Sequence, residues 1–166
     1  MNIFIHPRAN LLERLSEHDI DVATRTIVGE ARGEDFAGQL AVANVLLTRM
    51  LADWHGDGKP DWWGEGLAGV CLAPWQFSCW NVGDPNRPKI LGMKSSSPEY
   101  RRAQAILLLA ANGDLIDNAP KCTHYHHDTL AKPTSWLKGP PLEVYGNIGR
   151  HRFYYFLDAT IVGLPN

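Results

Sequence analysis

A glutamate at the expected end of a helix is the first side chain in this sequence that suggests chemistry. Glu30 lies in the run Gly-Glu-Ala-Arg-Gly-Glu, and Gly33 is expected to end the helix before it. A carboxylate there meets the negative end of the helix dipole, which disfavours its ionised form. A general acid must hold a proton near neutral pH, and this position favours the protonated form of the carboxyl group. The alternative is a solvated glutamate paired with Arg32 or Arg25.

A second carboxylate follows four residues later. In a continuous helix Glu30 and Glu34 would share a face, as a two-carboxylate glycosidase could use. The break expected at Gly33 separates them, so Glu34 is predicted to be a first-turn acid of the next helix. We therefore expect a stabilising role for Glu34.

The segment 74–81, Pro-Trp-Gln-Phe-Ser-Cys-Trp-Asn, mixes aromatic rings with amide and hydroxyl groups. These groups suit an amide-bearing sugar, because aromatic rings pack on the apolar faces of sugars and polar tips fix orientation. The alternative is a loop that its aromatic residues fold onto the core.

Histidines form the third candidate site. His124 and His126 alternate in a predicted strand and therefore share a face. With Asp128 and the distant His151 they have the ligand types of a zinc site, although no His-Glu-x-x-His motif is present. His127 is an alternative to His126 as the second ligand.

Periodicity indicates the elements that position these residues. Helices are expected at 19–33, 35–52 and 97–112, with a short helical turn at 67–72. The segment 74–98 is expected to be mostly irregular, and aromatic-rich strands are expected at 122–126 and 152–157. Asp19 is expected to cap the first helix, and Asp35 or Glu34 the second. The fold class is α+β, mainly helical, with a small late β-sheet.

Composition is that of an ordinary globular protein. The 166 residues fit one domain, with 1–18 as a leading segment, and 45% are hydrophobic and 20% charged. A net charge of −2 does not suit a nucleic-acid partner. Three cysteines leave at least one unpaired within a chain and predict no disulfide framework. No run reaches the 18 apolar residues of a membrane span.

Four blocks together resemble a known family. The run 29–34 followed by Gly-Gln-x-Ala-Val-Ala at 38–43 is similar to the opening signature of the SleB/CwlJ-type cell-wall hydrolases, with Thr48-Arg49 in place of the usual Asn-Arg. The segment 76–80, the segment 123–126 and the segment 148–154 resemble the family's later blocks, in the family's order.

The resemblance implies a lysozyme-like fold and an enzyme that acts on peptidoglycan glycan strands. It implies cleavage of the bond between N-acetylmuramic acid and N-acetylglucosamine (MurNAc-β-1,4-GlcNAc), by a lytic transglycosylase or a muramidase, with Glu30 as general acid and base. Gln76, Phe77 and Ser78 would bind substrate, with Tyr125 and His151 near the acid. Neither a cofactor nor a metal is implied, and we expect a monomer.

Two alternatives remain open from the sequence. One is a zinc-dependent peptidoglycan peptidase or amidase that uses His124, His126 and His151. The other is a glycan-binding module without activity. The N-terminal segment lacks the pattern of a signal peptide. We therefore expect a protein made in the cytoplasm that reaches the cell wall by another route, as phage lysis enzymes do.

Overall fold

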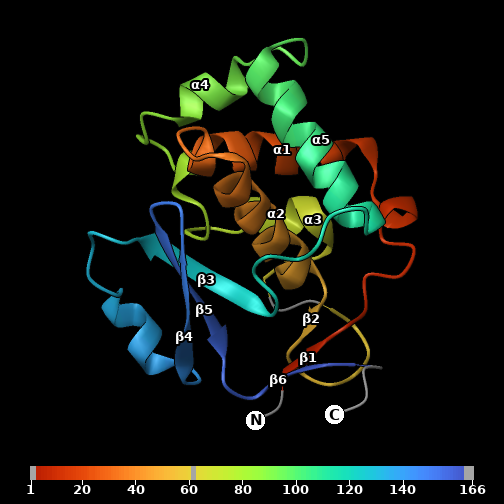
Figure 1. Cartoon of the computed structure of the whole chain (residues 1–166), viewed down its shortest axis with the longest axis vertical. Helices are drawn as coiled ribbons and strands as arrows, with labels where there is room; N and C mark the ends of the chain where they lie inside the picture. Colours follow the sequence, from red (N-terminus) through yellow and green to blue (C-terminus); the bar gives the residue numbers. More distant parts are fainter. Residues whose placement is uncertain (1–2, 61–62, 163–166) are drawn as a thin grey trace.

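The computed structural model describes residues 3–60 and 63–162. Helices gather on one side of the molecule and two small sheets lie on the other (Figure 1). The helices are α1 (Glu17–Ala31), α2 (Phe36–Met50), α3 (Gly66–Leu72), α4 (Arg87–Leu91) and α5 (Pro98–Asn112). The α+β, mainly helical fold class is therefore confirmed.

Helix α1 begins earlier than the sequence suggested. Ser16 is the N-cap, and its hydroxyl accepts a hydrogen bond from the Asp19 amide while the Asp19 carboxylate accepts one from the Ser16 amide. This reciprocal capping box satisfies two amides that the first turn leaves without a helical partner. Asp19 is thus the third residue of the helix rather than its cap. The helix ends at Ala31, two residues before Gly33.

Helix α2 is the centre of the helical layer. Asp35 caps it by accepting a hydrogen bond from the Gly38 amide at 2.9 Å. Every residue from Gly38 to Met50 is buried, because α1, α3 and α5 all pack on this helix. The expectation that Glu34 belongs to its first turn is wrong, since Glu34 precedes the cap.

The start of helix α5 was predicted correctly. Ser97 is its N-cap, Pro98 its first residue, and Gly113 ends it in the left-handed conformation at φ 83°. Proline is favoured at the first position because its missing N–H would have no helical partner there. The preceding segment is less irregular than expected, since it contains α4 and the 3-10 turn η2 (Ser78–Trp80).

The larger sheet is antiparallel, with strand order β3-β5-β4. Strands β3 (Cys122–His127) and β5 (His151–Phe156) match the two predicted strands to within a residue or two. Strand β4 (Leu142–Ile148) was not predicted, because its mostly exposed residues show no alternation of apolar and polar side chains. A 3-10 helix, η3 (Thr134–Lys138), lies between β3 and β4.

A second sheet, of order β2-β1-β6, was also missed. Its strands are β1 (Ile3–Ile5), β2 (Ala52–Asp53) and β6 (Ala159–Ile161), and a 3-10 turn, η1 (Leu12–Arg14), follows β1. Strands of two or three residues are too short for a periodic pattern to reveal. The leading segment therefore contributes to the fold, and Ile3 and Ala159 share one core with residues of α1, α2 and α5.

No helix in the described ranges is long and apolar enough to cross a bilayer. The three cysteines are all buried and unpaired. The expectation that at least one cysteine is unpaired within the chain is therefore confirmed.

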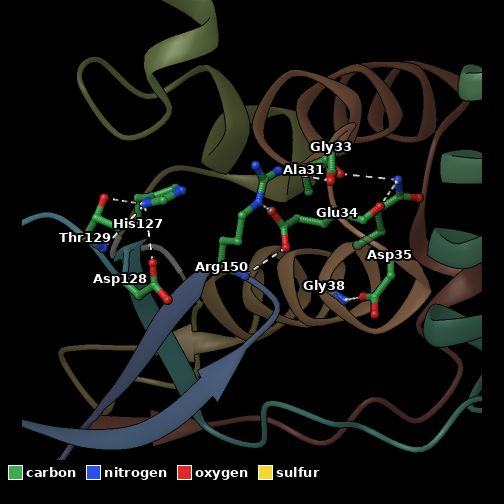
Figure 2. Close-up of polar contacts among 10 residues, drawn as sticks. Ala31, Gly33, Glu34, Asp35, Gly38, His127, Asp128, Thr129 and Arg150 are labelled. Carbon is green, nitrogen blue, oxygen red and sulfur yellow. Dashed lines mark hydrogen bonds and ion pairs between the residues drawn. The ribbon is translucent and has the colours of Figure 1, made fainter.

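Glu34 joins the helical layer to the larger sheet. Its carboxylate accepts hydrogen bonds from the backbone amide of Arg150 at 3.0 Å and from the Arg150 guanidinium at 2.8 Å (Figure 2). The Glu34 side chain is only 4% exposed. Burial by itself would raise the pKa of Glu34, but these hydrogen bonds outweigh it, so the pKa lies below its ordinary value. The turn between β4 and β5 is thereby held against the turn between α1 and α2.

Replacing this carboxylate should weaken the fold. Glu34→Gln removes the ion pair with Arg150 and should lower the free energy of unfolding by about 1–3 kcal/mol, measured by urea denaturation. Glu143→Gln is the matched control, because Glu143 accepts a hydrogen bond from Tyr155 on the exposed surface. Its effect should stay within about 0.5 kcal/mol. Equal effects of the two changes would contradict the role given to Glu34.

Candidate active site

Glu30 is held by two hydrogen bonds at the last turn of α1. One carboxylate oxygen accepts from the backbone amide of Cys79 at 3.2 Å, and the other accepts from the hydroxyl of Tyr125 at 3.1 Å. The two donors belong to η2 and β3, which lie far apart in the sequence. The carboxylate is therefore fixed at the meeting point of three elements, on a half-buried residue.

A close approach of α1 and η2 makes the first of these bonds possible. A Cβ atom on Gly29 would lie 2.6 Å from Cβ of Cys79, closer than atoms of folded proteins approach. The indole N–H of Trp80 also donates to the hydroxyl of Thr26 at 2.9 Å. Glycine at position 29 thus lets η2 lie against the helix, with the Cys79 amide within reach of Glu30.

Glu30 lies in the wall of a cleft of about 540 Å³. Its walls come from α1, α2, the residues just before and just after α3, β3 and the segment before β4. Its described lining residues are Glu30, Arg49, Trp63, Trp75, Gln76, His124, Tyr125, Pro133, Ser135 and Trp136. Among these, Glu30 is the one acidic side chain, and aromatic rings make up much of the wall, which suits a polar ligand with apolar faces.

Tyr125 acts as a permanent hydrogen-bond donor to Glu30. Burial raises the pKa of Tyr125 well above its usual value, and the charge of Glu30 raises it further. Its phenol therefore keeps its proton at neutral pH. The ring also lies edge-on to His151, with centroids 5.1 Å apart, and 5.5 Å from Phe153.

Arg49 places a buried positive charge in the wall of the cleft. Its guanidinium donates to the backbone oxygen of Thr123 at 2.7 Å and to the side-chain oxygen of Gln76 at 3.3 Å. It lies over the rings of Trp63 and Phe77, 5.1 and 4.9 Å from their centroids. Burial lowers the pKa of Arg49 to about 10, so the group stays charged at neutral pH.

The predicted site residues fall into two groups. Glu30, Gln76 and Tyr125 line the cleft together. Phe77 is 2% exposed and packs under Arg49, so it supports the cleft from the core. Ser78 is exposed but is not among the lining residues, and His151 is buried behind Tyr125.

The histidines do not form the zinc site considered from the sequence. His124 and His126 do share a face of β3, where their rings lie 4.8 and 5.8 Å from that of Trp136. His151 is on the other face, beside Tyr125 and His127. Within the described residues, no group of three or more histidine, cysteine, aspartate or glutamate side chains could hold a metal ion. The alternation of the strand thus separates the ligands that a zinc peptidase would need.

Several lining residues were missed as site residues. Arg49 follows a run of apolar or small residues at 40–47 in the same helix. A charged residue in an otherwise buried helix was the signal that could have marked it as a site residue. Trp63 and Trp136 stand in segments without periodicity, so nothing in the sequence indicated where their rings would lie.

His124 is kept neutral by its surroundings. Burial lowers the pKa of His124 to about 3, and the positive charges of Arg49 and Lys132 act in the same direction. An unfolded chain takes up this proton near pH 6.5. The contribution of His124 to stability is therefore present above about pH 6.5 and is lost as the pH falls toward 3, because the unfolded state binds the extra proton first.

Urea denaturation at pH 7 and pH 5 tests this linkage. We expect the histidine to account for a loss of about 1–2 kcal/mol in the free energy of unfolding over this range, a figure reduced for the partial exposure of the ring. His124→Asn should flatten the pH dependence by that amount. An unchanged pH dependence in the variant would show that His124 is not the group responsible.

Comparisons with known proteins give a family match and several relatives. Residues 33–154 match the model of the family described as Cell Wall Hydrolase. The chain is 43% identical over 147 residues to a spore cortex-lytic enzyme of Oceanobacillus iheyensis and 28% identical over 145 residues to that of Bacillus subtilis. These matches cover 89% and 87% of this chain but 45% and 40% of the relatives, so the chain spans less than half of their length.

Solved structures show the same architecture. The catalytic domain of the Bacillus cereus SleB protein superposes with a TM-score of 0.58 at 25% identity, over 83% of this chain and 90% of that one. The catalytic domain of the germination-specific lytic transglycosylase SleB from Bacillus anthracis gives a TM-score of 0.59 at 24% identity, over 84% and 95% of the two chains.

The fold is therefore the α+β fold of the SleB catalytic domain. The chain belongs to the cell wall hydrolase family.

Proposed function

We propose that this chain cleaves the β-1,4 bond between N-acetylmuramic acid and N-acetylglucosamine in peptidoglycan, with Glu30 as both acid and base. The position of Glu30 carries the proposal: a half-buried carboxylate, oriented by two donors, at the wall of a cleft rich in aromatic and amide groups. The names of its relatives, spore cortex-lytic enzymes, support a substrate in the bacterial wall.

Glu30 would act first as an acid. Protonated Glu30 donates its hydrogen to the bridging oxygen, the bond from that oxygen to C1 breaks, and positive charge develops on the sugar. Tyr125 and the Cys79 amide then donate to the carboxylate that remains.

The site contains no second catalytic carboxylate among its described lining residues. Glu34, the nearest candidate in sequence, is occupied by Arg150 and lies outside the cleft. The usual two-carboxylate scheme therefore does not apply, and the substrate's N-acetyl oxygen is suited to stabilise the cation.

This arrangement favours a lytic transglycosylase outcome. Ionised Glu30 takes the proton of the C6 hydroxyl of the same sugar, and that oxygen bonds to C1. The product is a 1,6-anhydro sugar, no water is consumed, and Glu30 is again protonated. If water attacks instead, the same residue gives a reducing end.

The role of Glu30 can be tested with an isosteric amide. Glu30→Gln should reduce the release of soluble fragments from purified sacculi at least about 1000-fold, because the side chain can no longer donate or take up the proton. The melting temperature should change little, since an amide can still bond to Tyr125 and the Cys79 amide.

Glu34→Gln is the matched control for activity. It should keep much of the wild-type rate when measured below its own unfolding temperature. Clearing of sacculi by Glu30→Gln, or complete inactivity of folded Glu34→Gln, would count against the single-carboxylate mechanism.

Mass spectrometry of the digestion products separates the two outcomes of cleavage. Muropeptides released by the wild-type protein should weigh one water less than the corresponding reducing fragments, because the C6 oxygen closes the ring. Digestion in water labelled with oxygen-18 should leave these fragments unlabelled. Labelled reducing ends as the sole product would show hydrolysis and rule out the transglycosylase version.

A further inference from the structure

Trp75 is the most exposed large aromatic side chain of the described residues. It lines the mouth of the cleft that contains Glu30, yet 83% of its surface is exposed. Its backbone has a φ of 66°, in the left-handed region that side chains with a Cβ rarely occupy. A large residue is thus held outward in a conformation that is locally unfavourable.

The strained conformation belongs to a tight turn. The Gln76 amide donates to the Ala73 carbonyl at 3.2 Å, Pro74 occupies the second position, and Trp75 the third. These features fit a type II turn, whose third residue needs a positive φ and is usually glycine or asparagine. Tryptophan is therefore the unusual choice at this position.

Packing within the chain does not explain the choice. Among the described residues, Trp75 has no ring contact and no side-chain hydrogen bond, and its exposure leaves its faces in water. The left-handed backbone of Trp75 costs stability, and the exposed indole gains none by burial to offset that cost. The benefit must come from a ligand that covers the ring.

The neighbouring Gln76 indicates which ligand. Its side-chain oxygen faces Arg49, which has only donors to offer. The amide NH2 group of Gln76 consequently points away from Arg49, and no described residue accepts from it. Trp75 thus offers an apolar ring face, and Gln76 offers a free donor beside it.

We propose that Trp75 and Gln76 form a binding site for one N-acetylated sugar of the glycan, at the mouth of the cleft. The indole covers the apolar face of the sugar ring, and the Gln76 amide donates to the acetamido carbonyl. This assignment rests on the proposed glycan-cleaving function. It adds a preference for N-acetylated sugars over unsubstituted glucans that Glu30 alone does not provide.

Binding measured without turnover tests the site. In the Glu30→Gln background, calorimetric titration with chitohexaose should give a Kd at least about 10-fold weaker for Trp75→Gly than for the Trp75 protein, whereas Trp75→Phe should stay within about 3-fold. Val82→Ala is the matched control, because Val82 is 89% exposed and is not among the residues that line the cleft. It should bind like the parent.

The same variants have a second readout that a structural role would not give. Glycine suits the turn, so Trp75→Gly should melt at the same temperature as the parent or higher while binding more weakly. A lower melting temperature together with unchanged chitohexaose binding would overturn the proposal. Failure of the Trp75 protein to bind chitohexaose would overturn it as well.

Cellohexaose, which lacks acetamido groups, tests the role of Gln76. It should bind the parent at least about 10-fold more weakly than chitohexaose, and Gln76→Ala should weaken chitohexaose binding while leaving cellohexaose binding unchanged. Equal affinity of the parent for the two oligosaccharides would contradict the specificity. These binding results stand apart from the proposed function, which fails separately if Glu30→Gln still digests sacculi.

Discussion

The buried guanidinium of Arg49 is the constraint on which the cleft depends. A lone buried charge costs several kcal/mol unless polar groups replace the water it loses. Here the backbone oxygen of Thr123, the amide oxygen of Gln76 and the faces of Trp63 and Phe77 replace it. Because these partners come from three segments, around Trp63, Gln76–Phe77 and Thr123, satisfying one cation ties those segments to α2.

The same interactions leave the charge of Arg49 available to the site. Its side-chain hydrogen bonds, to Thr123 and Gln76, do not involve a carboxylate, and the charge of Glu30 is close enough to act on the pKa of Arg49. A cation neutralised by an ion pair would contribute little to a reaction nearby. Arg49 instead remains a fixed positive charge beside a carboxylate that must gain and lose a proton. Structural support and electrostatic support for Glu30 thus come from one side chain.

The sequence predicted the elements that long periodic or capping patterns define. The span of α5 follows from Ser97, Pro98 and Gly113, and the position of Glu30 at the end of α1 follows from its helical spacing. Boundaries were less accurate, because Ser16 and Asp19 share the capping box of α1 and both residue types are favoured at an N-cap. The strands of the small sheet and β4 gave no pattern, since they are either two or three residues long or mostly exposed.

The cleft itself could be predicted only in part. Glu30, Gln76 and Tyr125 stand in blocks that resemble a family, and the structure brings them together. Trp63, Trp136 and the partners of Arg49 depend on contacts between segments up to 74 residues apart in sequence, such as Arg49 with Thr123. Such contacts arise from tertiary packing, which no local pattern specifies. The zinc alternative failed for a related reason, because residue spacing alone does not show that His151 lies across the sheet from His124.

A single carboxylate can serve as acid and then base only if its surroundings tolerate both protonation states. Two donors, the Cys79 amide and the Tyr125 hydroxyl, each hold one oxygen of Glu30. The residue is half-buried in the last turn of α1 and lines the cleft. The close contact at Gly29 makes this possible, because it brings the Cys79 amide to the end of the helix. The carboxyl group is therefore held at one place in the cleft by partners from two other elements, which is what a residue that returns its proton in each cycle requires.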